Sequence, residues 1–175
     1  GDFNGDGISD ILWHNSNDDR NSIWLFNSSA LPTGLQVSSR DSTWKVGGTG
    51  DFDGNGTDDI FWRQASTQKN VIWQMDTNAN PTGFVTDPRS AEWYPALVAD
   101  FDGDGTADLL WRHQDDNSNA IWTFDANLRP TGRRIATRDQ NWVAVRDVVT
   151  PPVDTSDATA EFYNANISAP IVQGQ

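Results

Sequence analysis

The stretch DFNGDGISDILW at residues 2–13 decides the fold, because it returns twice in the chain. A shift of 49 residues brings it, without a gap, onto DFDGNGTDDIFW at 51–62, and a second such shift brings it onto DFDGDGTADLLW at 100–111. A fixed period of about 20 to 50 residues is typical of solenoids, propellers and arrays. The nine tryptophans fall into three aligned sets: Trp13, Trp62 and Trp111; Trp24, Trp73 and Trp122; Trp44, Trp93 and Trp142.

The local patterns within each repeat are those of strands. The apolar runs are short, rich in aromatic and β-branched residues, and bounded by Gly, Pro, Asn and Asp. In the middle repeat we expect strands at residues 59–63, 71–75, 83–86 and 93–98. Four antiparallel strands per repeat, stacked through large aromatic side chains, are typical of a β-propeller blade. A lectin-like sandwich is the alternative.

The sequence therefore predicts an all-β fold of three four-stranded propeller blades. The blades are expected at residues 2–50, 51–99 and 100–148, within one domain that covers residues 1–148. The repeat pattern then gives way to a proline-led tail at 149–175. We expect the tail to be a linker or a strand that docks on a blade edge.

Composition excludes several classes of function. The 175 residues carry a formal net charge of −13 and a pI near 4.2, so nucleic acid is an unfavourable partner. No apolar run approaches the roughly 20 residues that span a bilayer, so we expect no membrane insertion. The absence of cysteine excludes disulfides, thiolate catalysis and cysteine-ligated zinc.

Each repeat opens with an acidic loop of the pattern Asp-x-[Asp/Asn]-x-[Asp/Asn]-Gly-x-x-Asp. Ca²⁺ takes six to eight oxygen ligands at about 2.3–2.6 Å, and a tightly wound loop presents side chains 1, 3 and 5 towards one point. The seventh residue is expected to add its backbone carbonyl, and the ninth-position Asp closes the site. The predicted ligands of three Ca²⁺ sites are Asp2, Asn4, Asp6, Ile8 and Asp10; Asp51, Asp53, Asn55, Thr57 and Asp59; and Asp100, Asp102, Asp104, Thr106 and Asp108.

Solvated Asp-Gly turns are the alternative interpretation of these loops. Three copies with matching oxygen positions favour calcium, and Mg²⁺ prefers fewer protein ligands. Ten of the 23 Asp residues lie at these positions, so calcium should relieve their repulsion and stabilise the fold. Asp58 has no acidic counterpart in the other repeats, and we assign it only a surface charge.

The loops, with Val46-Gly47-Gly48-Thr49-Gly50 before the second one and Asp-Ile-Phe-Trp at its end, resemble the FG-GAP/VCBS repeat family. The calcium-loop blades of this family also build the integrin α-subunit head. The resemblance covers residues 1 to about 148, and it implies a calcium-binding propeller of secreted or surface proteins that serves adhesion, ligand binding or scaffolding. Such propellers generally have six or seven blades. We therefore expect the partner to be the rest of a larger propeller or other copies of this chain, in self-assembly.

We expect no catalytic activity. The two histidines, His14 and His113, fall at different repeat positions, and the carboxylates that could form a glycosidase pair are already assigned as metal ligands. The expected location is extracellular or on the cell surface, with a surface protein or glycan as ligand. The alternative function is carbohydrate binding, or an accessory segment of a secreted polysaccharide-active enzyme. Its candidate sugar-stacking residues are Trp44, Trp93 and Trp142.

Overall fold

The computed structural model describes residues 1–15 and 17–145, and every element named below lies there. Contacts divide the chain into the units Gly1–Ala144 and Val145–Gln175, and the first unit holds all eleven strands of the described residues. The only helix in these ranges is the short 3-10 turn η1 (Ala65–Thr67), so the all-β prediction is confirmed. The described residues include no helix with the length and apolar character needed to cross a membrane. The predicted tail at 149–175 lies outside them.

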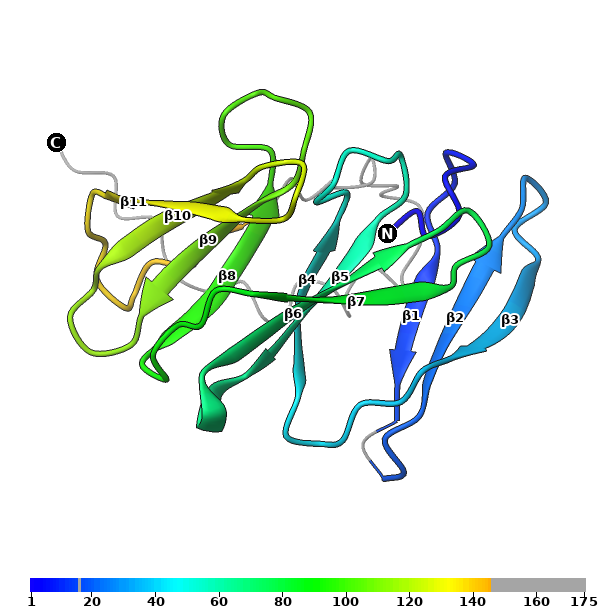
Figure 1. Ribbon diagram of the computed structural model, residues 1–175, viewed down its shortest axis with the longest axis horizontal. Coiled ribbons are helices and arrows are strands. Elements are labelled where there is room, and N and C mark those ends of the chain that lie inside the picture. Colours follow the sequence, from blue (N-terminus) through cyan, green and yellow to red (C-terminus); the bar gives the residue numbers. More distant parts are fainter. Residues whose placement is uncertain (16, 146–175) are drawn as a thin grey trace, which may run out of the picture. The chain divides into compact units, whose positions relative to one another are not determined.

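The strands form three antiparallel sheets in which neighbours in sequence are also neighbours in space (Figure 1). The first sheet contains β1 (Ile11–His14), β2 (Asn21–Phe26) and β3 (Pro32–Val37); the second contains β4 (Lys45–Gly50), β5 (Asp59–Gln64), β6 (Lys69–Met75) and β7 (Pro81–Thr86); the third contains β8 (Trp93–Ala99), β9 (Asp108–His113), β10 (Asn119–Phe124) and β11 (Pro130–Ile135). Each connection between neighbouring strands of one sheet is a hairpin or an acidic loop.

The sheets are offset from the sequence repeat by one strand. β8 ends the repeat at 51–99, yet it pairs with β9 of the third sheet, where Pro95 lies opposite Trp111. In the same way β4 pairs with β5 across the second acidic loop. The last strand of the 2–50 repeat, β4, belongs to the second sheet. The first sheet consequently has three strands rather than the expected four. Residues 142–145, at the corresponding position of the third repeat, lie in no strand.

Alternation along β5 explains why two hydrophobic cores form. Successive residues of a strand point to opposite faces of the sheet. Ile60 and Trp62 therefore pack towards the first sheet, whereas Phe61 packs towards the third, and all three are fully buried. Aromatic rings meet edge to face in both cores, with centroids 5.0 Å apart for Trp62 and Trp73 and 5.8 Å apart for Phe61 and Trp111.

A buried arginine braces the third sheet against the second. Arg63, at the end of β5, donates from Nη2 to the carbonyl oxygens of Arg89 and Ser90, just before β8. Arg112 repeats this contact one repeat later, with the carbonyl oxygens of residues 138 and 139. His14 stands at the same position of the first repeat, and its Nδ1 lies 2.8 Å from the side-chain oxygen of Asn21.

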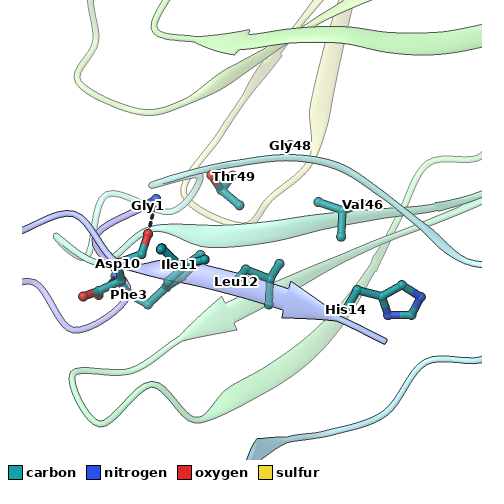
Figure 2. A pocket seen from close by; sticks show the side chains of 9 residues that line it. All are labelled: Gly1, Phe3, Asp10, Ile11, Leu12, His14, Val46, Gly48 and Thr49. Atoms are coloured by element: carbon teal, nitrogen blue, oxygen red, sulfur yellow. Dashed lines mark hydrogen bonds between the residues drawn. The ribbon is translucent and has the colours of Figure 1, made fainter. Parts of the chain in front are cut away.

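An open groove with a volume of about 400 Å³ lies between β1 and β4 (Figure 2). β1 is the edge strand of the first sheet, and Ile11, Leu12 and His14 line the groove from it. Val46 and Thr49 line it from β4. The backbone N–H and C=O groups on this side of β1 have no strand partner among the described residues, as at any sheet edge.

Candidate metal centre

The carboxylate of the first aspartate in each acidic loop accepts backbone N–H groups from later residues of the same loop, which curls the loop around it. Asp51 accepts the backbone N–H of Gly54 at Oδ1, 2.7 Å away, and that of Gly56 at Oδ2, 2.8 Å away. Both glycines have φ values in the left-handed region, +75° and +88°, which other residues adopt only with strain. The same pair of bonds joins Asp2 to Gly5 and Gly7, both at 2.8 Å, and Asp100 to Gly103 and Gly105, at 2.7 and 3.0 Å.

Carboxylates gather at positions 1, 3 and 9 of two loops. Asp51, Asp53 and Asp59 each place one oxygen within 4.8 Å of the others, and Asp100, Asp102 and Asp108 do the same. These are the two groups of this kind in the described residues. The first loop carries Asn4 at position 3, so its corresponding carboxylates are those of Asp2 and Asp10. The structure thus brings together three predicted ligands in each of the second and third loops.

The ninth-position aspartates are buried and tie each loop to its sheet. Asp59 is fully buried and accepts the N–H of Phe52 at Oδ2, 3.1 Å away, and that of Met75 at Oδ1, 2.9 Å away. Asp10 makes the equivalent bonds to Phe3 and Phe26, both at 2.9 Å.

The third loop differs at this position. Asp108 is fully buried, and its Oδ2 accepts the N–H of Phe101, 2.8 Å away. Its Oδ1 is buried with no hydrogen-bond partner. Leaving a buried acceptor unpaired is costly, so this oxygen is available to a cation.

The fifth-position side chains hold the seventh residue of each loop. The Oδ1 atoms of Asp6, Asn55 and Asp104 accept the backbone N–H groups of Ile8, Thr57 and Thr106 at 2.8, 2.7 and 2.8 Å. Asp104 is not among the three clustered carboxylates of its loop. Thr57 is buried, and its hydroxyl donates to the carbonyl of Met75, which fastens the second loop to the end of β6.

Sequence reasoning missed two residues at these loops. Gln74 donates from Nε2 to Oδ2 of Asp53, 2.7 Å away, and so orients a clustered carboxylate. Its only sequence signal is its place between Trp73 and Met75, which puts it on the opposite face of β6. Asp58 was assigned only a surface charge, but it is half-buried and contacts the first loop, with its Oδ2 3.0 Å from the backbone nitrogen of Asp2.

Burial raises the pKa of two clustered carboxyls. The pKa of Asp59 rises to about 7, chiefly because burial disfavours its charged form, and the nearby charges of Asp53 and Asp51 raise it further against the opposing hydrogen bonds from Met75 and Phe52. The pKa of Asp108 is raised for the same main reason. A cation in either loop would favour the charged form of the buried carboxyl and so oppose this rise in pKa.

The donor atoms fit a hard divalent cation. Every clustered side-chain atom is a carboxylate oxygen, with no imidazole or thiolate among them, and oxygen ligands suit Ca²⁺, Mg²⁺ and Mn²⁺. The unpaired Oδ1 of Asp108 supports the same conclusion from hydrogen bonding. The second and third loops therefore each offer a carboxylate cluster that could hold a metal ion.

The three tryptophans proposed for sugar stacking differ in their surroundings. Trp44 and Trp93 are both 8% exposed and lie under guanidinium groups, with Arg40 4.4 Å and Arg89 3.9 Å from the ring centroids. Trp142 is 59% exposed. Of the three, Trp142 is the one with a face open to solvent.

Comparison with known proteins agrees with the loop geometry. The family model described as an FG-GAP-like repeat matches twice, at residues 2–62 and 51–111. Each match runs from one acidic loop through the next loop and the strand that follows it, and together they cover more than half of the chain. A search of curated proteins finds no match. On the strength of the two family matches, the chain belongs to the FG-GAP-like repeat family.

Proposed function

We propose that the chain is a calcium-binding module of β-propeller blades that acts by binding another molecule. The row of acidic loops carries this proposal, because two of them gather three carboxylates each and belong to a repeat family that often binds calcium. We propose the first loop as a third site, in which Asn4 replaces the third-position carboxylate. The fifth-position oxygens and the seventh-position carbonyls would complete the ligand sets.

Bound Ca²⁺ would act as a structural ion that neutralises the clustered carboxylates. Each ion would supply two positive charges against a net charge of −13. The chain's own contribution is to wind each loop around its first aspartate and to anchor the ninth in the sheet, as Asp51 and Asp59 do. Because the ion binds only this folded arrangement, calcium should stabilise the fold.

The propeller proposal rests on how the sheets stack and on which faces they leave open. Trp62 and Trp73 are buried between the first and second sheets, whereas Trp13 and Trp24, at the same repeat positions, are 48% and 40% exposed. These two rings form an apolar face where another sheet would fit. We propose that the rest of a larger propeller, or another copy of the chain, covers it.

Binding rather than catalysis is also a proposal. His14 ends β1 and contacts Asn21, whereas His113 ends β9 and lies 3.2 Å from Asp116, so the two histidines are held by separate sheets. We place the protein outside the cell or on its surface, with a surface protein or glycan as ligand. The family supports this location, and calcium loops of extracellular modules fill at about 10⁻⁴–10⁻³ M calcium.

Calorimetric titration of metal-depleted protein tests calcium binding. We expect about three Ca²⁺ per chain and weaker binding of Mg²⁺. Replacing the third-position ligands together, Asp53→Ala and Asp102→Ala, removes the side-chain oxygen that the first loop keeps as Asn4, and should abolish the second and third sites. The matched control, Asp87→Ala with Asp115→Ala, loses the same charge at exposed positions outside the loops and should keep every site. Equal loss of binding in both double variants would contradict the proposal.

Trp142 favours carbohydrate binding as a second candidate function. It is 59% exposed, and the guanidinium of Arg138 lies 5.3 Å from its ring centroid, which places a cation beside an open aromatic face. A glycan array should then give signals that Trp142→Ala removes and Trp13→Ala keeps. An array without signals, or signals that survive Trp142→Ala, would reject Trp142 as a sugar platform.

A further inference from the structure

Neighbouring acidic loops are joined by backbone hydrogen bonds. The N–H of Asp58 donates to the carbonyl of Asp2, 2.7 Å away, and the N–H of Ala107 donates to the carbonyl of Asp51, 2.7 Å away. In both cases the eighth residue of one loop holds the first residue of the loop before it. Figure 1 shows the three loops along the same edge of the three sheets.

The loops also touch through their turns. A Cβ atom on Gly5 would lie 3.0 Å from the carbonyl oxygen of Gly56 and 3.3 Å from a methyl group of Thr57. One on Gly54 would lie 3.4 Å from the methyl group of Thr106. The fourth residue of the first loop therefore lies beside the sixth and seventh residues of the second, and the fourth residue of the second loop lies beside the seventh residue of the third.

The first and second loops share one bond that the second and third lack. The N–H of Asp2 donates to Oδ2 of Asp58, 3.0 Å away, so Asp58 holds Asp2 at both its N–H and its carbonyl. Ala107 stands at the equivalent position of the third loop and can make only the backbone bond. Asp2 is the residue around which the first loop winds, and Asp58 directly precedes Asp59, the buried carboxylate of the second loop.

We propose that Asp58 is a positioning residue that makes calcium binding in the first loop depend on calcium in the second. The inference rests on the proposed calcium function. An ion in the second loop would bind the carbonyl of Thr57 and the carboxylate of Asp59, the two neighbours of Asp58, and Asp58 then holds the backbone of Asp2 in the conformation that its carboxylate needs for binding. The first loop loses less conformational entropy when its own ion arrives, and this gives positive coupling.

Site-resolved titration can separate the loops, because each contains two glycines: Gly5 and Gly7, Gly54 and Gly56, and Gly103 and Gly105. The full chain, labelled with ¹⁵N-glycine, is titrated with Ca²⁺, and the midpoint of each pair of amide signals is followed by NMR. In Asp58→Ala the first-loop midpoint should rise roughly five-fold or more, within the usual range of coupling between sites. Because coupling is reciprocal, the second-loop midpoint can rise by at most the same factor, while the third-loop midpoint stays in place. Ala107 shows that the fold accepts alanine at this position.

Two further variants test the mechanism. Asp53→Asn weakens the second loop, so it should raise the first-loop midpoint in the unmodified chain but not in the Asp58→Ala background, as a double-mutant cycle requires. Asp58→Asn keeps an oxygen that can accept the N–H of Asp2, so it should restore the first-loop midpoint to within about two-fold. A first loop that stays weak in Asp58→Asn would mean that charge alone acts, and would overturn the positioning role.

Other outcomes also overturn the inference. An unchanged first-loop midpoint in Asp58→Ala would show that the shared bonds carry no coupling. An equal rise at all three loops would show a general loss of structure. If no loop glycine of the unmodified chain responds up to about 10 mM Ca²⁺, above the range of extracellular modules, the proposed calcium function itself fails, which the first two outcomes do not imply.

Discussion

The Nη2 atom of Arg63 lies 2.7 Å from the carbonyl oxygen of Ser90, and this contact joins the end of β5 to the segment that enters β8. A second bond from the same nitrogen reaches the carbonyl of Arg89 at 3.0 Å, and Nη1 reaches Oδ1 of Asn70 at 3.0 Å. Burial lowers the pKa of Arg63, but a guanidinium stays charged at neutral pH. One buried cation thus satisfies acceptors on both sides of a sheet junction.

Arg63→Ala should destabilise the fold by about 2 kcal/mol, because three hydrogen bonds from a charged donor are lost and their acceptors are left beside an apolar side chain. Urea unfolding, with and without calcium, measures the loss. Arg20→Ala is the control, since Arg20 is exposed and pairs with Asp18 at the surface, so its removal should change little. Equal losses in the two variants would contradict the bracing role.

The raised pKa of Asp59 predicts how stability without calcium depends on pH. The folded-state pKa is about 7, above the unfolded value of about 3.9, so the folded protein binds the extra proton. This contribution is fully present below the unfolded pKa and is lost as the pH rises through about 7. Calcium-free protein should therefore be more stable to urea at about pH 5.5 than at about pH 8, and Asp59→Asn should reduce the difference.

Calcium affinity should show the opposite trend with pH. Protons and Ca²⁺ compete for the carboxylate of Asp59, so affinity at the second loop should fall as the pH is lowered through about 7. Titrations monitored at Gly54 and Gly56 resolve this loop from the others. Affinity that does not change between about pH 8 and pH 5.5 would mean that Asp59 is not protonated in the metal-free protein.

Two tryptophans at the same repeat position differ in burial, so replacing each one tests how much the buried core contributes to stability. Trp111 is fully buried, whereas Trp13, at the same repeat position, is 48% exposed. Trp111→Ala should cost about 3–5 kcal/mol through lost burial and a cavity beside Phe61, and Trp13→Ala should cost clearly less. Chemical denaturation of both variants provides the comparison. Similar costs would indicate that another surface covers Trp13 under the conditions used.

Backbone strain in the loops can be separated from packing by alanine substitution. A Cβ atom on Gly56 would meet nothing within 4 Å, so Gly56→Ala should cost about 1–2 kcal/mol through its φ of +88° alone. Gly83→Ala is the control, because its Cβ would meet Trp73 at an ordinary 3.7 Å and its φ is not positive. Thermal unfolding should show a loss for the first variant and little change for the second.

Much of the fold follows from local sequence pattern. The strands expected at 59–63 and 93–98 occur as β5 and β8, with their ends shifted by one residue, because apolar alternation and flanking loops are local signals. The sheet to which β8 belongs does not follow from such signals. A repeat pattern is the same wherever the period is cut, so it cannot show that the last strand of one repeat pairs with the first strand of the next.

The candidate site likewise has features that follow from the sequence and features that only the structure shows. The oxygen-bearing positions and the turn glycines of each loop follow from spacing, since Asp51 and Gly56 act on each other within a few residues. Asp58 and Gln74 act on groups outside their own segments, on Asp2 and Asp53. Side chains that cross between loops or sheets have no fixed offset in sequence, and only the assembled structure shows their partners.

The one-strand offset between repeat and sheet has a consequence for how such a chain can evolve. β8 is the last strand of the repeat at 51–99, and it pairs with β9 of the next repeat. Neighbouring repeats therefore cannot separate without breaking the strand pairs of a sheet. Deleting or duplicating 49 residues, from any starting point inside a repeat, still joins each strand to a suitable neighbour. Recombination between copies of the gene segment can therefore change the length of the array in whole steps while keeping the strand pairs of the remaining sheets, whereas a cut of another length inside a strand would break the register of that strand.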